Sequence, residues 1–205
     1  MKNSFEIYSK LPPKFYRREL LDVAKDLLGK TFVRKINKKT LAGVIVEVEA
    51  YDGRTDKAAH SYGGINERNK TMFEQGGVLY VYFIYGIHYC CNVVTGQKGI
   101  GSGVLIRGLQ PAVGINTMIK NRFGNIEANE KQLRNLTNGP AKITQALNIN
   151  KMQNGTDLNG NQIFLAENNF SKEFEIISGK RIGIKKSADL LWRFYIKNNP
   201  YVSHI

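Results

Sequence analysis

Residues 77–95 read GVLYVYFIYGIHYCCNVVT. Aromatic and β-branched residues fill both halves of this stretch, and Tyr85 and Gly86 stand near its middle. Such residues are typical of strands, and glycine permits the backbone conformations of tight turns. We therefore expect two strands that reverse direction at Tyr85-Gly86. The stretch also carries more phenol hydroxyls than a buried strand needs, so it is either a core element or a surface that stacks on flat groups.

The rest of the chain predicts further strands mixed with helices. No βαβ period repeats along it, which indicates an α+β fold rather than a parallel sheet. By hydrophobic period and turn residues we expect the following elements: helices at 17–29, 112–123 and 138–148; strands at 31–36, 41–51, 103–111, 163–167, 174–179 and 179–185; an extended tail from 192; and a polar loop at 52–71 with a short helical piece around 56–60.

The strand predicted at 41–51 carries a pair of glutamates. Alternation places the valines at 44, 46 and 48 on one face and Ile45, Glu47 and Glu49 on the other. Read by itself, this is a strand with two solvated acids. Arg107, however, stands inside another apolar strand, where arginine usually has a carboxylate partner, and Glu49 is a candidate.

Composition limits the classes of partner. The chain has 205 residues, a formal net charge of +13 and 42% hydrophobic residues, which fits one soluble domain with a polyanionic partner. Solvated surface lysines are the alternative explanation of the charge. Acids cluster at Glu47, Glu49, Asp52 and Asp56, just before a basic stretch, and this arrangement suits an enzyme acting on a polyanion better than a simple phosphate binder.

Membrane, secretory and metal functions are not expected. No apolar run is long enough for a membrane helix, and the N-terminus lacks the apolar region of a signal peptide, so we expect a cytoplasmic protein. Cys90 and Cys91 are adjacent, and with the scattered histidines they show no zinc-ligand spacing.

Several ordered motifs together resemble the 3-methyladenine (alkyladenine) DNA glycosylase family of base-excision repair, in a bacterial form. They are VEVEAYDGRTDKAAHSYGG (46–64), RNKTMFEQGGVLYVYFIYGIHYCCNVV (68–94), GVLIRGLQP (103–111), NGPAKITQALNI (138–149) and RIGIKKSADLLWRFYIKNNPYVS (181–203). The resemblance implies one α+β domain over residues 1–205, with a curved antiparallel sheet flanked by helices, like the C-terminal domain of formyltransferases. Residues 1–16 are expected to form a loosely ordered N-terminal arm.

The resemblance implies the hydrolysis of a purine N-glycosidic bond. Glu49 would activate the attacking water and stabilise the oxocarbenium-like sugar as the base departs. Arg107 would help to hold this water, together with a backbone carbonyl near Ile184. Because no lysine matches a Schiff-base position, we expect a monofunctional enzyme that leaves an abasic site and needs no cofactor or metal.

The resemblance also implies base flipping from duplex DNA. Tyr85 would be the wedge that fills the space left in the helix. The flipped base would lie between Tyr51 and His60 on one side and Tyr82 on the other, and Asn92 would oppose the 2-amino group of guanine. Cationic alkylated purines would be favoured by the aromatic faces.

Contacts with the DNA backbone are less defined. Arg68 and Lys70 are the candidates, although the loop around Tyr62 differs from the family pattern in length and charge. The expected partner is double-stranded DNA that contains damaged purines (3-methyladenine, hypoxanthine or ethenoadenine), bound by a monomer.

Two other functions remain open. A non-catalytic nucleic-acid-binding module would use the tyrosines to stack on bases, but it gives Glu49 and Arg107 no task. A formyltransferase would need a folate site, for which the sequence has no motif.

Overall fold

A computed structural model describes residues 9–124, 127–168 and 173–203. Its centre is a nine-stranded sheet, in which every strand pairing is antiparallel. The strands are β1 (Thr31–Ile36), β2 (Lys39–Tyr51), β3 (Val78–Ile84), β4 (His88–Thr95), β5 (Ser102–Val113), β6 (Thr156–Asp157), β7 (Ile163–Ala166), β8 (Ile176–Gly179) and β9 (Arg193–Ile196). Their order is β6-β3-β4-β5-β2-β1-β7, and the β8–β9 hairpin joins through the pairing of β9 with β2.

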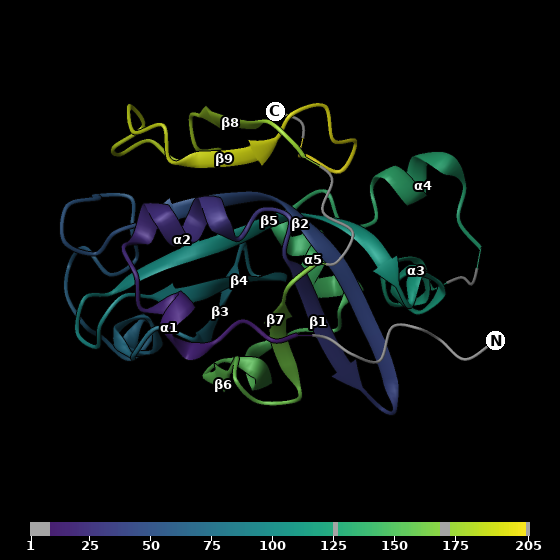
Figure 1. The fold of residues 1–205 in the computed structure, drawn as a ribbon, viewed down its shortest axis with the longest axis horizontal. Coiled ribbons are helices and arrows are strands. Elements are labelled where there is room, and N and C mark those ends of the chain that lie inside the picture. The colour runs from purple at the N-terminus through teal and green to yellow at the C-terminus, as the bar shows by residue number, and fades with distance from the viewer. Residues whose placement is uncertain (1–8, 125–126, 169–172, 204–205) are drawn as a thin grey trace.

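Short helices surround this curved sheet. They are α1 (Pro13–Tyr16), α2 (Leu20–Asp26), α3 (Ile115–Phe123), α4 (Glu130–Arg134) and α5 (Pro140–Ala146), with 3₁₀ turns η1 (Lys70–Phe73) and η2 (Lys151–Gln153). In Figure 1, α1 and α2 lie at one end, α3 and α4 at the other, and the β8–β9 hairpin runs along the top. No helix in the described part of the chain is long and apolar enough to cross a membrane. The expected α+β domain with a curved antiparallel sheet is confirmed.

One main core joins the helices to the sheet. Val23 and Ala24 of α2 and Ile143 of α5 are fully buried in it, together with side chains from β1, β2, β4 and β5. Proline at the first position of α5 suits a helix start because it lacks the N–H that would otherwise be unpaired. The opposite side of the central strands is left free to line a site.

A bulge in β2 corrects the alternation expected from the sequence. Ile45 pairs with Leu109 and Val48 pairs with Ile106, but the register shifts on both sides of Glu47. The extra residue rotates the strand, so Ile45 and Val48 both belong to the main core. Simple alternation predicted that Ile45 and Glu47 share a face of the strand. In the structure they do not.

The turn expected at Tyr85-Gly86 is present at the tip of the β3–β4 hairpin. Ile84 pairs with His88, and the Ile87 N–H donates to the Ile84 carbonyl at 3.2 Å. Tyr85 and Gly86 both have positive φ, 51° and 70°, which is the type I′ geometry favoured in hairpins. Glycine adopts this conformation freely, whereas tyrosine adopts it at a cost, and such strain is often kept at functional positions.

Three local expectations differ from the structure. Residues 179–185 were expected to be a strand, but β8 ends at Gly179 and the residues after it are irregular, with a bend at 182–183. The piece around 56–60 consists of turns rather than a helix. Of the expected N-terminal arm, residues 1–8 lie outside the described residues. Leu11 and Tyr16 are buried, so the part from about residue 11 onward is packed against the domain rather than loosely ordered.

Candidate active site

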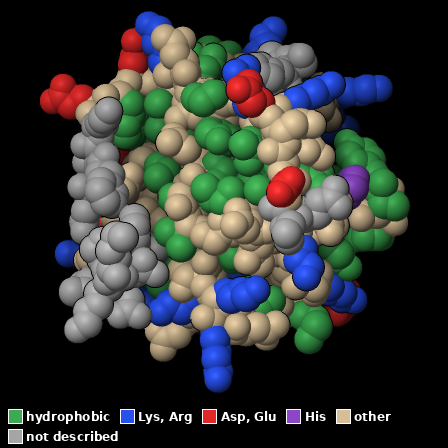
Figure 2. All heavy atoms as spheres, turned by 90° about the vertical axis from the view of Figure 1, so that its right-hand side faces the viewer, with side chains coloured by type: hydrophobic (Ala, Val, Ile, Leu, Met, Phe, Trp, Pro, Cys, Tyr) green, Lys and Arg blue, Asp and Glu red, His purple; other side chains and the backbone are tan. Residues whose placement is uncertain are grey.

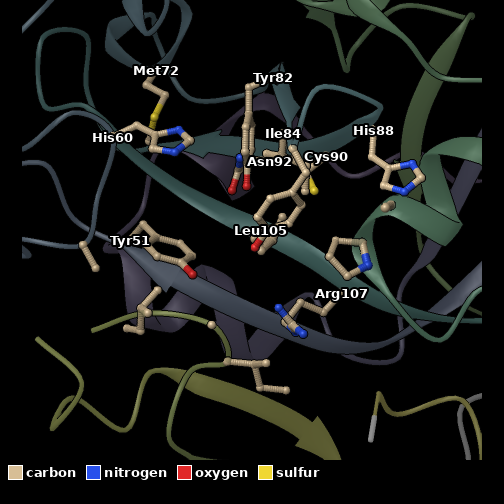
Figure 3. A pocket seen from close by; sticks show the side chains of 17 residues that line it. Tyr51, His60, Met72, Tyr82, Ile84, His88, Cys90, Asn92, Leu105 and Arg107 are labelled. Atoms are coloured by element: carbon tan, nitrogen blue, oxygen red, sulfur yellow. The ribbon is translucent and has the colours of Figure 1, made fainter. Parts of the chain in front are cut away.

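A pocket of about 400 Å³ opens between the central strands and the C-terminal segment, by which we mean the residues from 180 to 203. This is within the usual size of small-ligand sites. Figure 3 shows that its labelled side chains converge from several strands. The lining residues are Tyr51, Ala58, His60, Met72, Tyr82, Ile84, Tyr85, His88, Cys90, Asn92, Leu105, Arg107, Pro140, Ala141, Ile182, Gly183 and Ile184.

Glu49 lies behind the pocket lining, near the end of β2, and is fully buried. Its Oε2 accepts a hydrogen bond from the Tyr51 hydroxyl at 2.8 Å and one from Arg107 Nη1 at 3.4 Å. Its Oε1 accepts from the backbone N–H of Ile182 at 2.7 Å. Donors from β2, β5 and the C-terminal segment therefore fix both oxygens of one carboxylate beside the cavity.

Arg107 links Glu49 to the second glutamate of the strand. Its Nε donates to Glu47 Oε1 at 3.3 Å, and its Nη2 donates to Ser203 Oγ at 3.4 Å. Glu47 is itself held by Arg193 Nε at 2.6 Å. The guanidinium of Arg107 is thus oriented from behind by Glu47 and faces the pocket beside Glu49, as expected from the sequence.

Aromatic rings form two walls. His60 meets Tyr82 edge-on, with ring centres 4.6 Å apart and an interplanar angle of 86°, and Tyr80 stacks behind Tyr82 at 5.3 Å. Tyr51 comes from β2 and lies apart from these rings (Figure 3). His60 therefore belongs to the Tyr82 side of the pocket and not to the Tyr51 side, which corrects the expected grouping.

Burial keeps the pocket phenols and thiol protonated. Burial, and then the adjacent Glu49 carboxylate, raise the pKa of Tyr51 well above its usual value, so its hydroxyl stays a donor. Burial also raises the pKa of Tyr82, and it raises the pKa of Cys90 to about 11. A thiol of this kind has little thiolate near neutral pH and is a poor nucleophile.

The pKa of His60 shifts in the opposite direction, downward. Desolvation, followed by the positive charge of Arg68, lowers the pKa of His60 below its usual value, which favours the neutral imidazole. Its Nδ1 lies 3.4 Å from the Tyr80 hydroxyl. If this hydroxyl donates, Nε2 carries the proton and is the donor left for a ligand in the pocket.

Three further predicted residues line the pocket or its rim. Asn92 is buried on β4, in register with Leu105 of β5, and Ile184 belongs to the C-terminal wall. Tyr85 stands at the rim on the hairpin tip with 85% of its surface exposed. Its position is that of a protruding side chain rather than a wall.

Arg68 and Lys70 lie outside the pocket. Both are exposed; Arg68 Nη2 donates to the Phe83 carbonyl at 3.3 Å near the hairpin tip, and Lys70 pairs with Glu67 at 2.8 Å. Across the face shown in Figure 2, Lys and Arg side chains are spread around the rim of a largely uncharged centre. Within the described residues, no three His, Cys, Asp or Glu side chains are grouped so that they could hold a metal ion.

The structure adds supporting contacts that the sequence did not predict. Arg181 and Asp56 form a buried ion pair, and the buried Asn69 donates to the carbonyls of His60 and Gly64 at 2.8 and 2.9 Å. A charged residue just before the apolar run Ile182-Gly183-Ile184 was the available signal for Arg181. Nothing in the sequence identified its partner.

Comparisons with known proteins place the chain in a family. A family model described as methylpurine-DNA glycosylase matches residues 14–200. Proteins of Clostridium acetobutylicum and Clostridium novyi, both named "Putative 3-methyladenine DNA glycosylase", are 47% and 48% identical over 200 residues, which cover 95% of this chain and 97% and 98% of theirs. A Bacillus cytotoxicus protein of the same name is 46% identical over 202 residues, covering 95% of this chain and 99% of its own. With this match over nearly its whole length, the chain belongs to the methylpurine-DNA glycosylase family and is a DNA-repair glycosylase.

Proposed function

We propose that this protein excises alkylated or deaminated purines, such as 3-methyladenine, hypoxanthine and ethenoadenine, from duplex DNA by hydrolysis. The observation that carries the proposal is the buried Glu49 carboxylate, which is held by three donors from residues that line an aromatic pocket. The enzyme acts as a cytoplasmic monomer and leaves an abasic site without cutting the strand.

The hydrolytic step uses Glu49 and Arg107. As the purine departs, the sugar carbon gains positive charge, and the nearby carboxylate stabilises it while accepting a proton from the attacking water. Arg107 holds the water from the other side, and the carbonyl near Ile184 is the further acceptor. The Tyr51 and Ile182 donors keep Glu49 from turning away from the sugar.

Base recognition uses the two aromatic walls. A flipped purine stacks between Tyr51 on one side and His60 with Tyr82 on the other, and Asn92 opposes a 2-amino group. A positively charged alkylated base gains additional attraction from the ring faces. Tyr85 fills the space left in the duplex, where its exposure and strained turn suit it to insertion.

The test is excision of hypoxanthine and of 3-methyladenine from labelled duplexes under single-turnover conditions. We expect wild type to release the base, with strand breakage only after alkali, and Glu49→Gln to be slower by about 10³-fold. Glu175→Gln is the matched control, because it makes the same acid-to-amide change in an exposed ion pair with Lys197. Absence of release by wild type, or equal rates for wild type and Glu49→Gln, would refute the proposal.

A further inference from the structure

Arg181 occupies a buried position between three parts of the chain. Its Nη1 donates to the Ala50 carbonyl of β2 at 2.8 Å and also contacts Asp56 Oδ2. Its Nη2 donates to Asp56 Oδ1 at 2.9 Å and to the Ser187 carbonyl at 3.1 Å. The side chains of Arg181 and Asp56 are both fully buried, so this forked pair is shielded from water.

The same guanidinium lies behind the base pocket. It stacks on the ring of Tyr51, with its carbon 4.6 Å from the ring centre, and lies 5.5 Å from that of Trp192. Arg181 does not line the pocket, so its guanidinium covers the face of the Tyr51 ring that points away from the pocket. The next residue, Ile182, gives its N–H to Glu49. Displacing Arg181 would therefore move a pocket wall and a donor to the carboxylate together.

Asp56 connects the ion pair to the loop that presents His60, on the opposite wall of the pocket. Its Oδ1 also accepts from the Ala58 N–H at 3.0 Å, and the Ala59 N–H donates to the Asp56 carbonyl at 2.9 Å. These bonds set the tight turns that lead directly to His60. One ion pair thus touches the loop that presents His60, the back of Tyr51 and the segment that holds Glu49.

We propose that the Asp56–Arg181 pair is a positioning device that assembles the base-binding walls and the hydrolytic carboxylate into one geometry. This inference rests on the proposed function and names residues that act through others rather than on substrate. Buried ion pairs add little to stability compared with apolar residues of similar size, because of the desolvation of both charges. Their geometric precision is the property that this site uses.

The test compares Asp56→Asn, Arg181→Lys and the double variant Asp56→Asn/Arg181→Gln. The double variant leaves no uncompensated buried charge, so it is expected to fold even where Asp56→Asn does not. We expect it to excise hypoxanthine about 100-fold more slowly than wild type, because small displacements of reacting groups cost about that much. Its affinity for a duplex with a tetrahydrofuran abasic analogue should remain within about threefold, since that ligand has no base for the pocket. Arg181→Lys keeps the positive charge but not the two paired donors of the guanidinium. It should therefore excise faster than the double variant but more slowly than wild type.

Amide hydrogen exchange supplies a readout that does not depend on catalysis. In the double variant the Ile182 amide should lose protection, while the amides of β4 and β5 keep it, because the change is local. Glu175→Gln again serves as the control. Excision within threefold of wild type, an Ile182 amide that stays protected, or protection lost equally across β4 and β5 would each overturn the proposal. If wild type itself releases no base, the proposed function fails, and the exchange result still decides the positioning role.

Discussion

Glu47 and Glu49 are neighbours on one strand face, and we expect their amide variants to differ in how much excision rate they lose. Both glutamates are fully buried and neither lines the pocket itself, but all three donors to Glu49 belong to residues that do. The donors to Glu47 belong mostly to the C-terminal part of the chain. Glu47 accepts hydrogen bonds from Arg193 Nε at 2.6 Å, from Ser203 N at 2.6 Å and Oγ at 2.8 Å, and from Arg107 Nε at 3.3 Å. Glu47 therefore anchors the C-terminal segment and one pocket arginine.

The cost of Glu47→Gln follows from this set of partners. Glutamine keeps one acceptor oxygen and turns an amide NH₂ toward donors, so part of the four-bond set must break. Arg107 and Arg193, 8% and 5% exposed, would lose the charge that neutralises them. Breaking a buried pair in this way costs about 3–5 kcal/mol. For a domain of this size, such a loss lowers the melting temperature by about 6–20 °C.

Thermal unfolding and single-turnover excision separate the two glutamates. At a temperature where Glu47→Gln is fully folded, we expect its excision rate to fall only about 10-fold, because Arg107 keeps Glu49 and Ser203 as partners. Glu49→Gln should lose about 10³-fold in rate. A melting temperature for Glu47→Gln within about 2 °C of wild type would refute the anchoring argument. So would a loss of rate as large as that of Glu49→Gln.

Three further predictions concern the rim of the site. Tyr85→Ser should weaken binding to a hypoxanthine duplex by about 10-fold or more without lowering the melting temperature, since the ring is exposed and its loss relieves no buried contact; unchanged affinity would exclude the wedge role. Folding lowers the pKa of His60, so the unfolded chain binds its proton more readily and stability falls as the pH drops below about 6.5; His60→Gln should melt with a smaller difference between neutral and acidic buffer, and an equal difference would contradict this. Arg68→Gln should reduce the salt dependence of DNA affinity by about one unit of slope, whereas Lys70→Gln should reduce it less because Lys70 already pairs with Glu67; titrations at several salt concentrations measure both.

The strands could be predicted because their patterns are local. The hairpin at Asn37-Lys38 needs only residues that tolerate positive φ, and both have it, at 47° and 62°. The Tyr85-Gly86 turn is set in the same way by its own two residues. In each case the flanking apolar runs fixed the strand register without information from the rest of the chain.

Other features depend on distant partners, and local patterns predicted them poorly. The bulge at Glu47 arises where β2 pairs with β5 on one side and β9 on the other, and only the assembled sheet imposes that shift. The residues after Gly179 alternate like a strand, yet they form none because Arg181 and Ile182 are held by groups elsewhere in the chain. A single sequence shows that Arg181 and Asp56 are charged. It does not show that these two residues, 125 positions apart in the chain, form an ion pair.

The hairpin tip that carries Tyr85 and the part of the site around Glu49 differ in how far their geometry depends on the whole fold. Tyr85 is placed by a two-residue turn with no long-range contact needed for its exposure, so its insertion can be changed without touching the chemistry. Glu49 is placed by donors from β2, β5 and the segment after β8, and none of these elements sets its position alone. Substitutions at the hairpin tip should therefore alter DNA affinity, whereas substitutions in any of the three supporting elements should alter the rate of base release from DNA already bound. A rate that followed hairpin-tip affinity in every variant would show that flipping, and not hydrolysis, limits this enzyme.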